Sequence, residues 1–159
     1  MVSIVFTKNN SCLSKLIRWI ANEPVSHVAI IFDKKIVFHS NLYGVNVQWF
    51  SSFLKTHEIV YQLDYAYSLE QEEEVYQKIP EYDGHRYDLG ALFYLAWRGI
   101  LYKLFKKPIP KDNLFGNKDQ FLCVELAKII DPKLENLEMT SPYQVYLELK
   151  NNNFIWLSK

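Results

Sequence analysis

The chain lacks most of the features that would assign it quickly to a class of protein. Its 159 residues include only two cysteines, Cys12 and Cys123, which lie far apart in the sequence. One disulfide between them is an open alternative, but two cysteines exclude a disulfide framework. Lys plus Arg and Asp plus Glu number 18 each, so the formal net charge is zero. A balanced charge provides no overall field that would favour nucleic acid or an anionic membrane as a partner.

Long apolar runs and targeting signals are also missing. The longest apolar stretch, Leu89 to Trp97, is too short to cross a bilayer and is followed by Arg98. Met1 to Phe6 has no basic region and no cleavage site of small residues, so it predicts a strand rather than a signal peptide. No spacing of Cys, His and Asp resembles a zinc site, and there is no glycine-rich phosphate loop. We therefore expect a soluble, cytoplasmic protein without a metal or a cofactor.

The length of the chain suits a single domain, residues 1–159, that can bury a core without disulfides or metal. Aromatic residues are frequent, with 11 Tyr, 10 Phe and 4 Trp. Such a content fits either a heavily aromatic core or a groove for extended ligands. Composition alone does not separate these two interpretations.

Apolar periodicity predicts extended segments early in the chain and helices late. The extended segments are Val2–Phe6, His27–Phe32, Ile36–His39, Val45–Trp49 and Glu58–Tyr65. The helices are Ser11–Ala21, Ser68 to Pro80, Tyr87 to about Phe105, one that begins near Phe121 or Leu122, and one that begins at Ser141-Pro142. Phe50–Lys55 is a short helix or turn, Lys106–Asn117 a lid or a disordered connection, and Asp131-Pro132 a break. This order predicts an α+β fold, with a small antiparallel sheet packed against helices.

Three residues, Cys123, His27 and His39, are the types from which thiol-based catalytic sites are built. Cys123 lies where a helix is expected to begin, and the first turn of a helix lowers a thiol pKa and holds an oxyanion through its unpaired N–H groups. His27, at the start of a strand, suits the base that takes the thiol proton, and His39 suits the partner that fixes the tautomer of this base. Without a catalytic role, Cys123 would be a buried apolar residue, and the two histidines would be core residues whose ring nitrogens are hydrogen-bonded.

The register of one hairpin decides whether His27 and His39 share a face of the sheet. If Phe32 pairs with Ile36, the loop is Asp33–Lys35 and both imidazoles point the same way. If Phe32 pairs with Lys35, they point to opposite faces, and only a bulge restores the triad. The sequence leaves both registers open.

Other polar residues are weaker candidates for the site. Tyr87 and Asp88, at the start of the long helix, are candidate substrate-binding residues, although Asp88 also suits a helix-start role alone. Glu125 follows Cys123 by two positions and cannot share its helical face, so it suits a salt bridge better than a base. His57 and His85 are expected to be exposed to solvent.

Several short motifs follow one another in a recognisable order. They are Ser26-His27-Val28-Ala29-Ile30, Gly44-Val45 before Trp49, Gly84-His85-Arg86-Tyr87-Asp88, and Cys123-Val124-Glu125-Leu126. From His27 to about Ile130, this order resembles the circularly permuted papain-like amidases of the NlpC-type superfamily, in which the histidine strand precedes the cysteine helix. The resemblance implies a permuted papain-like fold, with Cys123 as the nucleophile and His27 as the base.

The resemblance has two branches. His39 falls where many bacterial members carry a glutamate, and where lecithin retinol acyltransferase-like enzymes carry a second histidine. Val124 stands where many bacterial relatives have serine, and the long cysteine motif of the acyltransferase branch is absent. These departures leave the substrate open rather than the catalytic pair.

The main prediction is a cysteine hydrolase that cleaves an amide bond through an acyl-thioester, with a peptide or peptidoglycan-like substrate. One alternative is lipid acyl transfer or lipid hydrolysis at a membrane surface, where the helix up to Phe105, with Lys103, Lys106 and Lys107, would lie in the interface. The other is a non-catalytic module that binds a peptide or a lipid on the same fold. No nucleic acid partner is expected, and the sequence does not set the oligomeric state.

Overall fold

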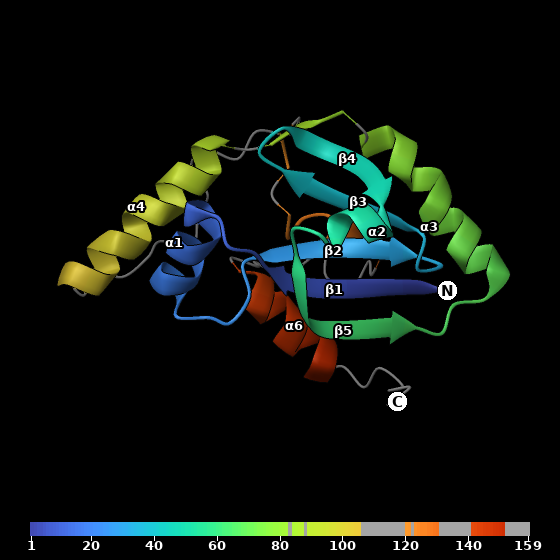
Figure 1. The fold of residues 1–159 in the computed structure, drawn as a ribbon, viewed down its shortest axis with the longest axis horizontal. Coiled ribbons are helices and arrows are strands. Elements are labelled where there is room, and N and C mark those ends of the chain that lie inside the picture. The colour runs from blue at the N-terminus through green and yellow to red at the C-terminus, as the bar shows by residue number, and fades with distance from the viewer. Residues whose placement is uncertain (83, 88, 106–119, 122, 131–140, 152–159) are drawn as a thin grey trace.

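The computed structural model describes residues 1–82, 84–87, 89–105, 120–121, 123–130 and 141–151. Here the chain forms an α+β structure in which an antiparallel sheet is flanked by helices (Figure 1). The strands of this sheet are β1 (Val2–Lys8), β2 (His27–Phe32), β3 (Ile36–Asn41), β4 (Gly44–Trp49) and β5 (Glu58–Tyr65). The helices are α1 (Cys12–Ala21), α2 (Phe50–Phe53), α3 (Leu69–Tyr82), α4 (Leu89–Phe105), α5 (Ala127–Ile130) and α6 (Pro142–Asn151). The predicted α+β class is confirmed, and each predicted extended segment is a strand.

The sheet places the histidine strand at its centre. The strand order is β4-β3-β2-β1-β5, and all neighbours are antiparallel. A second, parallel sheet joins two-residue strands, β6 (Arg86–Tyr87) and β7 (Gln120–Phe121). The sequence does not predict this small sheet, because strands of two residues have no periodic signal.

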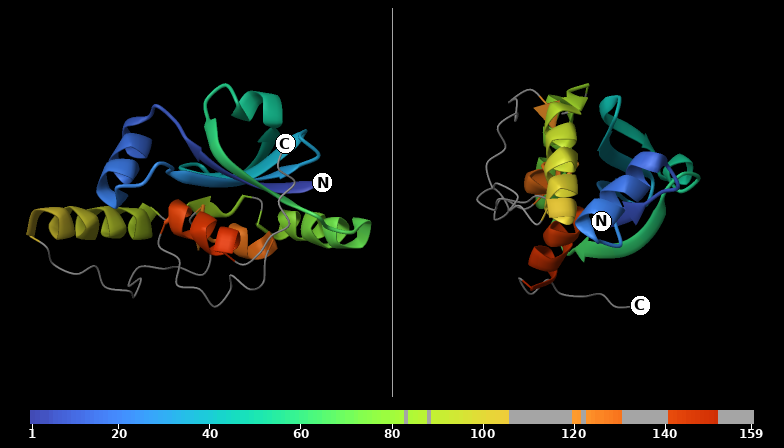
Figure 2. Two further views of the ribbon diagram at one scale, coloured as in Figure 1. Left: turned by 90° about the horizontal axis from the view of Figure 1, so that it is seen from below. Right: turned by 90° about the vertical axis from the view of Figure 1, so that its left-hand side faces the viewer.

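Helices cover the two faces of the large sheet unequally (Figure 2). α3, α5 and α6 line one face, and the short α2 covers the other. Successive side chains of a strand point to opposite faces, so each strand contributes to two separate cores. Val28 and Ile30 pack in the larger core with α3, α5 and α6. Ala29 and Ile31 pack in a smaller core with Phe53 of α2. We call these two sides the helix face and the α2 face.

The β2–β3 hairpin has the register that places both histidines on one face. Phe32 pairs with Ile36, and Ala29 pairs with His39. His27 precedes Ala29 by two residues, so its side chain leaves the sheet on the same side as that of His39. One of the two registers that the sequence left open is therefore confirmed, and it is the one that the proposed triad needs.

Prolines lie near the ends of two helices, and each was predicted to end its helix. α1 is capped by Ser11, whose hydroxyl accepts from the Ser14 N–H, and it ends at Asn22 (φ 58°), two residues before Pro24. The prediction that Pro80 ends the next helix is wrong, because α3 continues to Tyr82. Proline lacks an N–H and crowds the carbonyl four residues before it, which disturbs only the last turn when it stands near a helix end.

The long apolar helix matches its prediction closely. α4 runs from Leu89 to Phe105, so it begins two residues later than expected. In the described ranges no helix is long and apolar enough to cross a membrane. The predicted loop over residues 106–117 and the break at 131–132 lie outside the described residues. Cys12 is an exposed free thiol and Cys123 a buried one, so the disulfide that the sequence left open is not formed.

The β3–β4 turn depends on a glycine. Gly44 has φ 118°, and a Cβ there would overlap the backbone carbonyl oxygen of His85. That oxygen accepts a hydrogen bond of 2.8 Å from the Val45 N–H, so the two segments are held together. We predict that Gly44→Ala lowers the free energy of unfolding by about 2 to 4 kcal/mol, measured by urea denaturation.

Gly84→Ala is the matched control for this substitution. Gly84 also has a positive φ (79°), but nothing lies within 4 Å of the position its Cβ would take. We therefore expect a loss of only about 1 kcal/mol, from backbone strain alone. If both variants lost the same free energy, the overlap with His85 would not be the reason for the glycine.

Candidate functional site

His27 and His39 meet on the α2 face of the sheet. His27 Nε2 and His39 Nδ1 lie 3.1 Å apart, at hydrogen-bond distance, and the ring planes are at 86° to each other. Both rings also contact Phe53 of α2, with centroid distances of 6.5 Å for His27 and 5.3 Å for His39. His39 is only 1% exposed, and His27 is half-buried. Strand register and α2 thus hold the pair in place.

The hydrogen-bond chain continues from His39 into β4. Gln48 Nε2 lies 2.8 Å from His39 Nε2, and Asn46, which is opposite His39 in the strand register, also hydrogen-bonds to it. A neutral imidazole has one donor and one acceptor nitrogen, so the partner of one nitrogen sets the role of the other. Where the Gln48 amide donates, His39 carries its proton on Nδ1 and donates to His27 Nε2, and His27 keeps its own proton on Nδ1. Where the amide is turned so that its oxygen accepts, His39 carries its proton on Nε2, His27 Nε2 donates to His39 Nδ1, and His27 Nδ1 is free to accept a proton. Only the second arrangement lets His27 act as a base.

A third imidazole joins this cluster. The ring of His57 stacks on Phe53 with a centroid distance of 4.2 Å, and it lies 5.4 Å from His27 and 6.0 Å from His39. The prediction that His57 is exposed is wrong, because the chain after α2 turns the half-buried ring onto Phe53. The available signal was the spacing of four residues between Phe53 and His57, which places two rings side by side in a helical turn.

Burial lowers the pKa of all three imidazoles. It lowers the pKa of His39 to about 4, with repulsion from His57 as a second cause and the hydrogen bond with Asn46 opposing both. Burial, and then repulsion from His39 and His57, hold the pKa of His27 well below its usual value. Burial also lowers the pKa of His57, although this ring is less deeply buried than the other two. The three rings are therefore uncharged at neutral pH, and an uncharged imidazole is the form that accepts a proton.

Cys123 lies in a turn, so the prediction that it begins a helix is wrong. β7 occupies Gln120–Phe121, residues 123–126 form the turn, and α5 begins only at Ala127. The turn closes through bonds that span three residues, such as Ala127 N–H to Val124 C=O at 3.3 Å, which is tighter than an α-helix. Leu122 lies outside the described residues.

Burial dominates the chemistry of the thiol. It raises the pKa of Cys123 to about 11, although hydrogen bonds from the backbone N–H groups of Val28, Cys123 and Val124 lower it. Glu125 adds a small repulsion that also raises it. Backbone donors at the thiol were expected, but a lowered pKa was expected with them, and that expectation is wrong. The thiol is protonated at neutral pH.

The thiol and the imidazoles approach the same end of β2 from different faces. Cys123 belongs to the core of the helix face, whereas His27 and His39 lie on the α2 face with Phe53. Val28, whose N–H bonds to the thiol, directly follows His27 and lies beyond the β2–β3 register, which ends at Ala29. Among the described residues no hydrogen bond joins Cys123 to His27, so Val28 is the link between them.

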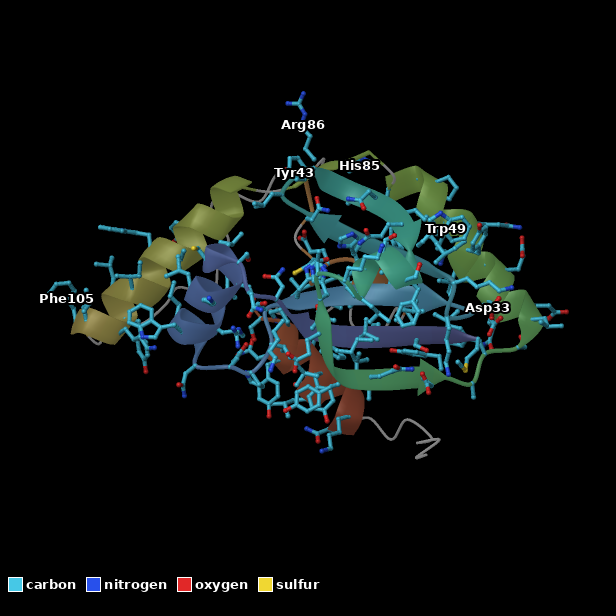
Figure 3. All side chains as sticks on the ribbon, viewed as in Figure 1. Asp33, Tyr43, Trp49, His85, Arg86 and Phe105 are labelled. Atoms are coloured by element: carbon cyan, nitrogen blue, oxygen red, sulfur yellow. The ribbon has the colours of Figure 1, made fainter. Side chains whose placement is uncertain are left out.

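The small parallel sheet brings the predicted substrate-binding segment beside the cysteine. Tyr87 of β6 pairs with Phe121 of β7, which is two residues before Cys123. β4 contacts both of these short strands, and Figure 3 shows His85 and Arg86 at the same edge of the molecule as Tyr43. The backbone of Tyr87 therefore lies close in the fold to the segment that carries Cys123. Asp88 lies outside the described residues.

No model of a known protein family matches this chain, and no curated protein or solved structure matches it. In the part of the chain that the structure describes, no group of three His, Cys, Asp or Glu side chains is arranged to hold a metal ion.

Gln48→Glu tests the hydrogen-bond chain. A carboxylate accepts but does not donate at His39 Nε2, so it favours a proton there and raises the pKa of the imidazole. We expect the pKa of His39 to rise by about one unit or more, followed by NMR titration of its ring protons. Gln48→Leu, which has neither donor nor acceptor, should leave the pKa of His39 low. If Gln48→Glu did not change the titration, the contact between Gln48 and His39 would be wrong.

Proposed function

We propose that the chain is a cysteine hydrolase with a circularly permuted papain-like fold, which cleaves an amide bond in a peptide or peptidoglycan-like substrate. One observation carries the proposal: the hydrogen-bonded pair of His27 and His39 adjoins Val28, whose N–H bonds to the Cys123 thiol. A thiol, an imidazole base and a second group that orients this base are the components of a thiol hydrolase. Their order along the chain agrees with the resemblance noted in the sequence.

In the proposed mechanism, Cys123 Sγ attacks the carbonyl carbon of the amide as its proton passes to His27. The tetrahedral intermediate collapses when the C–N bond breaks, and His27 returns the proton to the leaving amine. Water then attacks the acyl-thioester and gives a proton to His27. Cleavage of the C–S bond releases the acid, and the proton returns to the thiol. His39 keeps the ring of His27 oriented throughout.

The oxyanion of each intermediate needs at least one backbone donor. The N–H groups of Cys123 and Val28 both hydrogen-bond to the thiol, so they lie next to the carbon that Sγ would attack. Donors at this position stabilise the negative oxygen of an acyl-transfer transition state. We assign them as the two donors of the proposed oxyanion hole.

A second candidate function is a non-catalytic module that binds a peptide or a lipid on the same fold. The observation that favours it is the state of the thiol, which is buried, has a pKa of about 11 and has no hydrogen bond with His27 among the described residues. A binding module needs no thiolate, so such a cysteine is simply part of the core. The experiment below separates these two functions.

The test is to trap the acyl-enzyme. The protein is incubated with peptide p-nitroanilides and with p-nitrophenyl esters of short and long acyl chains, quenched in acid, and analysed by mass spectrometry of its peptides. A hydrolase should carry one acyl group on the peptide that contains Cys123, and the preferred acyl chain separates amide from lipid substrates. A binding module should carry none.

Cys12→Ala and Cys123→Ala are the paired variants for this measurement. Cys12 is the exposed thiol, so it reports acylation that needs no active site. The adduct should persist in Cys12→Ala, disappear in Cys123→Ala, and form more slowly in His27→Ala. Acylation on Cys12 alone, or on neither cysteine, would reject the proposed activity.

A further inference from the structure

We infer that the end of the molecule formed by α1 and α4 binds the surface of an anionic lipid bilayer. This inference does not depend on the proposed function. It starts from exposed apolar side chains that the core does not use. On these two helices they are Leu16, Trp19, Trp97, Tyr102, Leu104 and Phe105, each between 40% and 65% exposed. We call this set the aromatic end.

The aromatic end projects away from the rest of the molecule. α4 lies beside α1 and extends beyond the end of the sheet, as Figures 1 and 2 show in different views. Phe105 is at its outer tip (Figure 3). A large side chain exposed singly is normal, whereas several exposed on two packed helices are typical of an interaction site.

The two helices are held together as one unit. Gly99 of α4 faces Ile20 of α1 so closely that a Cβ would overlap the Ile20 side chain. Lys103 donates to the backbone carbonyl of Trp19, and its ammonium lies 4.2 Å above the centre of the Trp19 ring. This cation–π contact covers one side of the indole with a positive charge. The aromatic end is therefore a preformed surface on which a basic group, Lys103, lies directly over an aromatic ring, that of Trp19.

Charge is segregated between the two ends of the molecule. α1 and α4 together contain Lys15, Arg18, Arg98 and Lys103 and no acidic residue. α3, at the opposite end in Figure 1, contains five glutamates and only one lysine. The zero net charge of the chain thus conceals a strong asymmetry.

An anionic bilayer is the partner that fits this combination. Trp, Tyr, Phe and Leu insert at the headgroup level, while Lys and Arg contact anionic headgroups. The acidic α3 would be repelled by the same surface, so the molecule would dock with only one end.

The experiment is co-sedimentation of the full chain with vesicles of phosphatidylcholine alone or of phosphatidylcholine and phosphatidylglycerol in a three-to-one mixture. We expect binding to the anionic vesicles, weaker binding at high salt, and little binding to phosphatidylcholine alone. Trp97→Ser combined with Phe105→Ser should lower the partition coefficient at least about tenfold. Lys15→Gln should lower it about fivefold.

Trp49→Ser is the matched control. Trp49 is 67% exposed, as much as Trp97, but it lies on β4 away from the aromatic end (Figure 3). This variant should bind vesicles like the parent, and so should Cys123→Ala, which separates lipid binding from catalysis. Brominated lipids should quench tryptophan fluorescence in the Trp49 variant as in the parent, but less in the Trp97 variant.

Three outcomes would overturn the inference. The first is no binding to anionic vesicles, and the second is equal binding by the parent and the Trp97/Phe105 variant. The third is a dimer in sedimentation velocity that the Trp97/Phe105 variant abolishes while vesicles stay unbound, which would assign the surface to a second copy of the chain.

Discussion

Alkylation of Cys123 by iodoacetamide is expected to be slow near pH 7 and to accelerate about tenfold with each pH unit up to about pH 11. Burial raises the pKa of this thiol to about 11. Near pH 7 only about one molecule in ten thousand then carries the thiolate, which is the form that reacts. The rate is followed by mass spectrometry of the Cys123 peptide in a Cys12→Ala background, so that only the buried thiol is counted.

Two comparisons sharpen this prediction. In urea, Cys123 of the unfolded chain should be alkylated at the rate of an ordinary thiol. This rate should level off above about pH 8.5. His27→Ala should change the native profile little, since no hydrogen bond joins the imidazole to the thiol among the described residues. A native plateau near pH 8.5 or below, lost in His27→Ala, would instead demonstrate a thiolate–imidazolium pair and contradict the resting state described above.

The resting state restricts the proposed mechanism. A pKa of about 11 for Cys123 and an uncharged His27 mean that no preformed thiolate waits for the substrate. The proton would have to leave Sγ in the same step in which Sγ attacks, when the developing oxyanion binds the N–H groups of Cys123 and Val28. We therefore expect activity to depend on a good substrate fit, and generic thiol reagents to be poor reporters of the site.

The histidine pair shows what the sequence was able to predict. Apolar runs located β2 and β3 correctly, because buried strands give long Val, Ile and Phe segments. The register between these two strands could not be predicted, because the loop after Phe32 allows Phe32 to pair with either Lys35 or Ile36. Only the folded hairpin, with Ala29 opposite His39, decided it.

Cys123 and His57 show where tertiary contacts override local signals. The segment around Cys123 has a helical composition, yet β7 pairs with β6 just before it, and the thiol is drawn into the core. His57 lies between Thr56 and Glu58, which do not predict burial, but the turn after α2 stacks it on Phe53, four residues earlier in the sequence. Both differences depend on elements that are distant in sequence or very short.

The distribution of charge along the chain could be predicted from the sequence only in part. Equal numbers of acidic and basic residues give a net charge of zero, which by itself argues against an electrostatic partner. The sequence already held the asymmetry, since five glutamates lie in α3 and none in α4. What it did not show is that α1 packs beside α4, which places their four basic residues at one end.

Acid is expected to destabilise the fold through the imidazole cluster. His39 has a pKa of about 4 in the folded chain and an ordinary value of 6.5, so the unfolded chain takes up the proton first as pH falls. Its contribution to stability is therefore complete above about pH 6.5 and is lost progressively down to about pH 4. For His39, which is 1% exposed, the loss is about 3 kcal/mol, and His27 acts in the same direction.

Urea denaturation of the parent and of His39→Gln, near pH 7 and near pH 4, measures this loss. Carboxyl groups also titrate in this range, but they do so in both proteins, so the difference between the two pH dependences isolates His39. The variant should lose about 3 kcal/mol less than the parent between the two pH values. If His39→Gln followed the parent, His39 would not be a buried, uncharged imidazole, and the hydrogen bonds that orient His27 would have to be reassigned.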